Sequence, residues 1–152
     1  MKIMKTEIFL PLSIDQAWDF FSSPKNLNII TPDDMNFKIT SFLPNKIYKG
    51  LFITYKISPV FKIPIEWITE ITQIEENKYF IDEQRKGPYK IWHHEHHFKE
   101  LNGGVLMTDL LFYEVGSSFL GWLASKLWVD KKVNAIFKYR EQKLISLFPL
   151  KK

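Results

Sequence analysis

Residues 91–115, IWHHEHHFKELNGGVLMTDLLFYEV, decide the fold of this 152-residue chain. The stretch holds two runs of strand-like composition, Ile91–Leu101 and Val105–Val115, which are rich in aromatic and branched apolar residues. Between them stands Asn102-Gly103, a dipeptide typical of two-residue β-hairpin turns. The sequence therefore predicts a long antiparallel hairpin, since strands joined by so short a turn must run in opposite directions.

The first strand of this hairpin carries all four histidines of the chain. Alternate side chains of a strand point to opposite faces of its sheet. One face therefore carries Trp92, His94, His96 and Phe98. The other is expected to contact solvent, and it carries Ile91, His93, Glu95, His97 and Lys99. Two imidazoles between two aromatic rings are unusual for a core, so we interpret the first face as the polar strip of a mostly apolar pocket.

A two-residue turn fixes the register of the hairpin, because the pairs are counted outward from Leu101 and Gly104. The resulting pairs are Phe98 with Met107, His96 with Asp109, His94 with Leu111, and Trp92 with Tyr113. A three-residue turn would shift this pairing and move Asp109 to the opposite face. We favour the two-residue turn because it brings two imidazoles, two aromatic rings and a carboxylate together. A carboxylate beside an imidazole raises the pKa of the imidazole and fixes its tautomer.

The composition is that of a globular chain, with 45% hydrophobic, 16% aromatic and 25% charged residues. Without a repeat or a composition break, residues 1–152 are most simply one domain. The net charge of +4 comes mostly from scattered lysines, and Arg85 and Arg140 are the two arginines. The sequence has no basic stripe and does not favour nucleic-acid binding. Cysteine is absent, which excludes disulfides and thiolate chemistry.

The sequence predicts no membrane-spanning segment. The longest apolar run, Phe119–Val129, is interrupted by Lys126 and is shorter than the roughly 20 residues that a helical span needs. Charged side chains recur at Lys2, Lys5 and Glu7, before the apolar core of a secretory signal could form. We therefore expect a cytoplasmic protein that does not insert into a membrane.

The residues before the hairpin predict one strand, two short helices and four further strands. Ile3–Leu10 is the first strand, and Pro11 ends it. A capping box of Ser13 and Gln16 begins a helix, and Pro24–Ile30 forms a second one with proline at its first position. The apolar face of the first helix is Ala17, Phe20 and Phe21. The four following strands are Phe37–Leu43, Leu51–Ser58, Ile65–Ile74 and Tyr79–Arg85.

The end of the chain changes from strand periodicity to helix periodicity. From Phe119 to Phe148, one approximate helical stripe carries Leu120, Leu123, Leu127, Phe137, Leu144 and Phe148. Ser117 or Ser118 could cap this helix, whose length would approach about 45 Å. A long helix that follows a run of antiparallel strands must bury its stripe on the sheet. The predicted fold class is therefore α+β.

Several local motifs occur in order along nearly the whole chain. They are residues 23–32 (SPKNLNIITP), residues 82–89 (DEQRKGPY), the alternation from Trp92 to Phe98, Asp109 with Tyr113, and residues 137–140 (FKYR). With the order of elements, they resemble the START-like superfamily, also called SRPBCC, which has the helix-grip fold of the birch-pollen allergens. They are similar to a bacterial subgroup related to a domain fused to sugar-nucleotide-epimerase-like proteins, although the chain has no dinucleotide fingerprint.

The resemblance implies both a fold and a kind of site. The fold is a curved antiparallel sheet of about six or seven strands around a long C-terminal helix, with two short helices after the first strand. The site is a cavity between sheet and helix for a hydrophobic or amphipathic small molecule. Members of the superfamily include lipid carriers, hormone receptors and aromatic-polyketide cyclases, so the fold narrows the function very little.

Three functions remain open on the sequence. The first is binding of a hydrophobic or aromatic small molecule, with its polar end at His94, His96 and Asp109. The second is a cyclase- or dehydratase-like enzyme that uses the same set for proton transfer. The third is a protein–protein adaptor whose core is filled, in which His96 and Asp109 form a buried pair that only satisfies polar groups.

The candidate ligand-binding residues are Trp67, Asp82, Gln84, Trp92, His94, His96, Asp109 and Tyr113. Asp82 and Gln84 share a face with Phe80 and either extend the polar network or lie at a solvated edge. The aromatic residues expected nearest the cavity are Trp67, Phe80, Trp92, Tyr113, Trp122 and Phe137. His94, His96 and Asp109 have the donor types of metal ligands, but their spacing matches no common metal motif. We expect neither a resident metal nor a cofactor.

Overall fold

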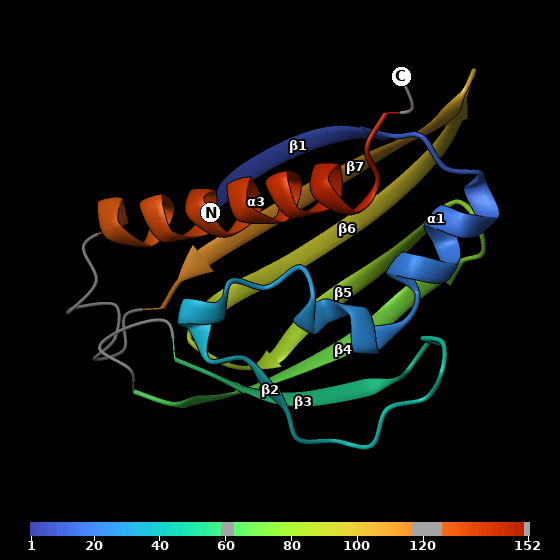
Figure 1. The fold of residues 1–152 in the computed structure, drawn as a ribbon. Helices are drawn as coiled ribbons and strands as arrows, with labels where there is room; N and C mark the ends of the chain where they lie inside the picture. Colours follow the sequence, from blue (N-terminus) through green and yellow to red (C-terminus); the bar gives the residue numbers. More distant parts are fainter. Residues whose placement is uncertain (59–62, 117–125, 151–152) are drawn as a thin grey trace.

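Seven strands form one antiparallel sheet in the computed structural model, which describes residues 1–58, 63–116 and 126–150. The strands are β1 (Lys2–Leu10), β2 (Lys38–Ile39), β3 (Phe52–Ile57), β4 (Ile65–Glu75), β5 (Tyr79–Lys86), β6 (Tyr89–Leu101) and β7 (Gly104–Val115). Their spatial order is β1-β7-β6-β5-β4-β3-β2, so the first strand pairs with the last and the others follow the chain. The sheet curves around the side on which helix α3 (Lys126–Leu147) lies (Figure 1). The predicted helix-grip architecture is confirmed.

The hairpin of β6 and β7 has the predicted two-residue turn. The pairs are Leu101 with Gly104, Phe98 with Met107, His96 with Asp109, His94 with Leu111, and Trp92 with Tyr113. Gly103 has a φ of +85°, a left-handed conformation that glycine adopts at little cost. A side chain at Gly104 would meet the backbone oxygen of Leu10 at 2.3 Å, so glycine there lets the end of β1 approach. Turn chemistry and a close backbone contact together set the register.

The outer face of β6 contacts solvent, as the alternation predicts. The His93 side chain is 30% exposed and the His97 side chain 43%. His93 Nε2 lies 3.1 Å from Glu95 Oε1, and His97 Nε2 lies 2.7 Å from Glu95 Oε2. His94 and His96, one residue along, are buried on the inner face.

The strand predicted over Phe37–Leu43 is wrong in extent. Only β2, Lys38–Ile39, pairs with β3 as a strand, and the contact with β3 ends at Ser41, whose N–H donates to Thr54 O at 3.2 Å. Phe42 is 89% exposed, and Pro44 has no N–H to donate to a strand ladder. Apolar composition alone predicted the longer strand, whereas a strand also needs a neighbour with which to exchange hydrogen bonds.

Helix α1 (Ile14–Phe21) and two 3-10 helices, η1 (Pro24–Asn28) and η2 (Asp33–Met35), follow β1. The capping box is confirmed: Gln16 N donates to Ser13 Oγ at 3.2 Å, and Ser13 N donates to Gln16 Oε1 at 3.0 Å. Helix α1 buries Trp18, whose ring meets that of Phe98 edge-on at 5.6 Å. The two short helices were predicted, and the second is a 3-10 helix.

Helix α3 packs its buried side chains on β7. Val129, Val133 and Phe137 form one cluster with Leu111 and Tyr113 of the sheet. Of the predicted stripe, Phe137 and Leu144 are confirmed as buried. The predicted helix start at Phe119, its caps, Leu120, Leu123, Trp122 and the side chain of Leu127 lie outside the described residues. Within the described ranges, no helix combines the length and the apolar character needed to cross a bilayer.

Candidate functional site

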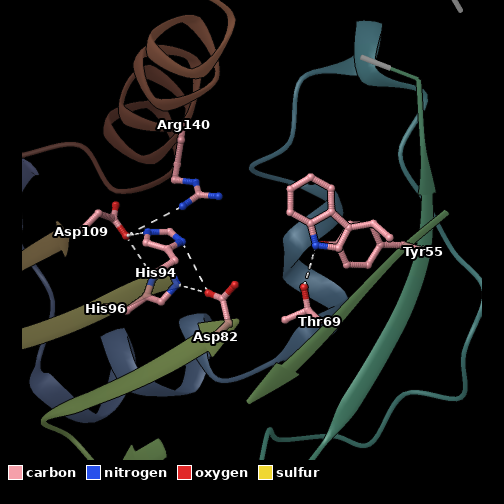
Figure 2. Close-up of polar contacts among 8 residues, drawn as sticks. Tyr55, Thr69, Asp82, His94, His96, Asp109 and Arg140 are labelled. Atoms are coloured by element: carbon pink, nitrogen blue, oxygen red, sulfur yellow. Dashed lines mark hydrogen bonds and ion pairs between the residues drawn. The ribbon is translucent and has the colours of Figure 1, made fainter. Parts of the chain in front are cut away.

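Four polar side chains from three neighbouring strands meet on the inner face of the sheet (Figure 2). We call Asp82 of β5, His94 and His96 of β6, and Asp109 of β7 the His–Asp cluster. His94 Nε2 lies 3.0 Å from Asp109 Oδ1, and His96 Nε2 lies 2.8 Å from Asp82 Oδ2. The other two nitrogens also face carboxylates, with His94 Nδ1 3.5 Å from Asp82 Oδ2 and His96 Nδ1 2.9 Å from Asp109 Oδ1. The His96 Nδ1 contact is not aligned for a hydrogen bond and is electrostatic.

Burial and the two carboxylates set the protonation of the cluster. Burial lowers the pKa of His94, and the neighbouring charge of His96 lowers it further. Burial also opposes protonation of His96, but Asp109 and Asp82 outweigh it, and the pKa of His96 is raised. Burial would raise the pKa of both carboxyls, yet the imidazoles outweigh it, so Asp109 lies well below its ordinary pKa and Asp82 below it. The cluster therefore favours ionised carboxyl groups on Asp82 and Asp109. A proton bound by the histidine pair lies on His96 rather than on His94.

Arg140 completes the site from the helix layer. Its Nη1 lies 3.8 Å from Asp109 Oδ1, and its guanidinium carbon lies 4.9 Å from the ring centre of Phe137. Its side chain is only 12% exposed. Arg140 belongs to the motif at residues 137–140 but was not predicted as a site residue. The sequence did hold one indication of its position. Arg140 lies three residues after Phe137 and four before Leu144, a spacing that places it on the same buried helical stripe.

An aromatic group of Tyr55, Trp67, Tyr89 and Trp92 adjoins the His–Asp cluster, where the ring of Trp92 meets that of His94 edge-on at 6.4 Å. Tyr55 stacks on Trp67 at 5.8 Å between ring centres, and Trp67 meets Trp92 edge-on at 5.1 Å. Trp67 Nε1 donates to Thr69 Oγ1 at 3.0 Å, and the Tyr55 hydroxyl lies 3.0 Å from the same oxygen. Burial raises the pKa of Tyr55, so this hydroxyl stays protonated. The group forms a rigid aromatic wall with one polar anchor at Thr69.

Two adjoining cavities lie between the sheet, the short helices and α3. The first, the apolar cavity, has a volume of about 140 Å³. Its walls include Met35, Tyr55, Ile57, Trp67, Tyr89, Trp92, Val129 and Ile136. In the second, the polar cavity, the corresponding volume is about 130 Å³, and the walls include Phe21, Ile53, Thr69, Phe80, Asp82, His94 and His96. Leu27, Tyr55, Trp92 and Arg140 line both cavities.

Most predicted site residues lie around these cavities. Those that line one or both are Trp67, Asp82, Trp92, His94 and His96, and of the further aromatic candidates Phe80 lines the polar cavity. Asp109 lies behind the two imidazoles, and it borders a third cavity together with Phe137 and Arg140. The sequence predicted the alternation that brings these side chains to one face but missed Arg140, Tyr55 and Thr69.

Gln84 and Tyr113 have other partners. Gln84 Nε2 donates to Tyr89 O at 2.6 Å and Gln84 Oε1 accepts from Tyr89 N at 3.2 Å, which braces the turn between β5 and β6. The Tyr113 hydroxyl donates to Asp130 Oδ1 at 2.8 Å and ties β7 to α3. Neither residue is among the described lining of the two cavities.

The His–Asp cluster also has the donor types of a transition-metal site. One ligand atom from each of Asp82, His94 and His96 lies within 4.8 Å of the others. A cation there would have to displace the contact between His96 and Asp82, and the positive charge of Arg140 opposes it. The absence of a resident metal stays a prediction.

Comparisons with known proteins show the fold. No family model and no curated protein matches the chain. The solved structure of CV1439 from Chromobacterium violaceum is 8% identical, with 98% of each chain covered and a TM-score of 0.73. Ms6760 from Mycobacterium smegmatis is 15% identical over 95% of this chain and 89% of that chain, with a TM-score of 0.68.

Ara h 8.0201, a Bet v 1-like protein, is 14% identical over 95% of this chain and 98% of that chain, with a TM-score of 0.60. Likeness at such identities shows the fold alone, and membership of the bacterial subgroup stays a prediction. The chain therefore has the helix-grip fold of the START-like, or SRPBCC, proteins.

Proposed function

We propose that the chain binds a hydrophobic or aromatic small molecule between the sheet and α3. The body of the ligand lies in the apolar cavity, and its polar end reaches the polar cavity. The observation that carries this proposal is that the two cavities adjoin at Arg140, with aromatic walls on one side and the His–Asp cluster on the other. A concave, mostly apolar site with a few convergent polar groups is the usual form of a small-molecule site.

The geometry supports binding over catalysis by proton transfer. A general acid or base needs a nitrogen within hydrogen-bond reach of the substrate. In His94 and His96, all four ring nitrogens face a carboxylate of Asp82 or Asp109 at 2.8–3.5 Å. The imidazoles are therefore engaged as structural and electrostatic groups, which makes the cyclase- or dehydratase-like alternative the weaker one.

The two cavities also favour a ligand over an adaptor with a filled core. Protein interiors are close-packed and leave few voids larger than a water molecule. A cavity lined by Trp67 and Trp92 offers dispersion contacts that a ligand of matching shape would gain.

Thermal unfolding in the presence of aliphatic and aromatic compounds tests the proposal. A ligand at about 100 times its dissociation constant stabilises the native state by about 2.7 kcal/mol. For a chain of this size, that corresponds to a rise of about 5–10 °C in the melting temperature. The proposal is overturned if no compound raises the melting temperature and the protein as purified carries no bound compound in native mass spectrometry.

A matched pair of variants on α3 locates the site. Ile136 lines the apolar cavity, so Ile136→Trp should fill it and abolish the ligand-induced rise. Ile145 is 53% exposed on the same helix, and Ile145→Trp should leave the rise unchanged. If the two variants respond alike, the ligand does not lie in this cavity.

A further inference from the structure

Arg140 carries charged N–H groups that are buried without a hydrogen-bond acceptor. Its Nε and Nη1 atoms have no hydrogen-bond partner within the described residues. Asp109 Oδ1 lies 3.8 Å from Nη1, which is beyond hydrogen-bond distance. A guanidinium remains charged throughout the accessible pH range, and leaving its donors buried and unpaired costs free energy. The side chain therefore lacks an acceptor at the junction of the two cavities.

The hydroxyl groups of Tyr55 and Thr69 line the same cavity. Thr69 Oγ1 accepts from Trp67 and shares one hydrogen bond with the Tyr55 hydroxyl. The two hydroxyls carry two hydrogens, and their mutual hydrogen bond uses one of them. The other hydrogen has no acceptor in the part of the chain that the structure describes. Tyr55, Thr69 and Arg140 all line the polar cavity, and Figure 2 shows the guanidinium beside the His–Asp cluster, across from Tyr55 and Thr69.

The N–H groups of Arg140 and the spare hydroxyl hydrogen are donors, so a ligand that satisfies them must carry acceptor oxygens. The planar guanidinium fork matches the two oxygens of a carboxylate. A doubly charged head group such as phosphate is disfavoured, because Asp82 and Asp109 already place two carboxylates in the cluster. A neutral ester lacks the negative charge and the two equivalent oxygens that make a carboxylate a bidentate partner of arginine. The charges thus favour a single negative charge on the ligand.

We propose that the ligand is a monocarboxylic acid with an apolar body, whose carboxylate binds the Arg140 guanidinium and the Tyr55–Thr69 hydroxyls. Its apolar body lies against Trp67 and Trp92 in the apolar cavity. This inference rests on the proposed function and deepens it, since it assigns the chemical class of the ligand and the residue that selects it. Arg140 is then the specificity-determining residue of the cavity.

Matched ligands test the class of head group. Isothermal titration compares dodecanoate with methyl dodecanoate and 1-dodecanol, and 2-naphthoate with methyl 2-naphthoate. Because only the acid offers a charged acceptor with two oxygens to the charged guanidinium, at least one acid should bind about tenfold or more tightly than its neutral partners. Equal affinities within both series would overturn the carboxylate assignment without touching the proposed function. No binding by any of the five probes would count against both.

Arginine variants test the selecting residue. Arg140→Met keeps an unbranched apolar stem and removes the guanidinium with its charge, so it should weaken binding of the acid about tenfold and leave the ester within about twofold. Arg85 is exposed and pairs with Glu70 and Glu83, and Arg85→Met is the matched control, which should bind both probes as the wild type does. Arg140→Lys keeps the charge and loses the fork, and an intermediate affinity for the acid is expected.

The comparison of acid with ester in the wild-type protein needs no variant and decides the class even if Arg140→Met does not fold. An acid preference that persists unchanged in a folded Arg140→Met or Arg140→Lys protein would overturn the role of Arg140.

Discussion

His96 and Asp109 stand directly opposite each other on β6 and β7, yet the aligned hydrogen bond of Asp109 goes to His94. His96 instead bonds Asp82 on β5, the strand on its other side. The carboxylate of Asp109 therefore serves both imidazoles, one by a hydrogen bond and one by charge. This sharing links the protonation of the two histidines.

Replacement of Asp109 by asparagine should lower the pKa of both histidines. The carboxylate favours the protonated form of each ring, and asparagine removes the charge while keeping a similar shape. Histidine ring signals followed by NMR over a pH titration measure the change. Asp34→Asn, which removes an exposed carboxylate that pairs with Lys132, is the control. Unchanged titration of His96 in Asp109→Asn would contradict the cluster geometry.

The two buried histidines should affect stability with opposite pH dependence. The pKa of His96 is raised in the fold, so its stabilisation is fully present below the ordinary value of about 6.5 and is lost as pH rises through the higher folded pKa. The pKa of His94 is lowered, so the unfolded chain takes up a proton that the fold resists, and stability falls as pH drops below about 6.5. The charged groups that face both rings are Asp82 and Asp109, and Arg140 lies behind them with Nη1 3.8 Å from Asp109 Oδ1.

Urea unfolding at about pH 5.5 and about pH 8.5 measures this difference. The loss of stability in His96→Gln should be larger at the acidic pH, and the loss in His94→Gln should be larger at the basic pH. His97→Gln removes an imidazole on the outer face and is the control. Parallel pH trends for the two buried variants would contradict the assigned directions.

Thr69 should matter more to stability than Thr72 on the same strand. Thr69→Val leaves the buried N–H of Trp67 without an acceptor, which should cost about 1–3 kcal/mol. Thr72 Oγ1 is buried and has no hydrogen-bond partner within the described residues, so Thr72→Val should be nearly neutral or stabilising. Urea unfolding compares the two variants. Equal losses would show that the Thr69 hydrogen bond contributes nothing.

Tyr113 should stabilise the protein without selecting the ligand. Partial burial and the hydrogen bond to Asp130 raise the pKa of Tyr113 to about 12. Tyr113→Phe removes that bond between β7 and α3 and should cost about 1–2 kcal/mol in urea unfolding. The affinity for dodecanoate should stay within about twofold of the wild type. A stable variant with weakened binding would return Tyr113 to the set of ligand contacts.

The correct predictions of strand pairing and helix start rest mostly on local features of the sequence. The Asn102-Gly103 turn and the period of two gave the pairing of His96 with Asp109, and the capping box at Ser13 gave the start of α1. These features depend on residues close in sequence or on one turn, where backbone geometry leaves few choices. Prediction was poorer at Phe37–Leu43, because pairing there depends on a distant partner strand.

The sequence by itself determined the succession of strands, the face on which each histidine lies and the burial of Phe137 and Leu144 on the last helix. Only the tertiary structure decided which carboxylate bonds which imidazole, that Arg140 reaches the cluster, and that Tyr113 turns to Asp130. Periodicity fixes the direction of a side chain relative to its own element. Distances between elements depend on how far the sheet curves and where the helix crosses it, which the packing of the whole chain decides.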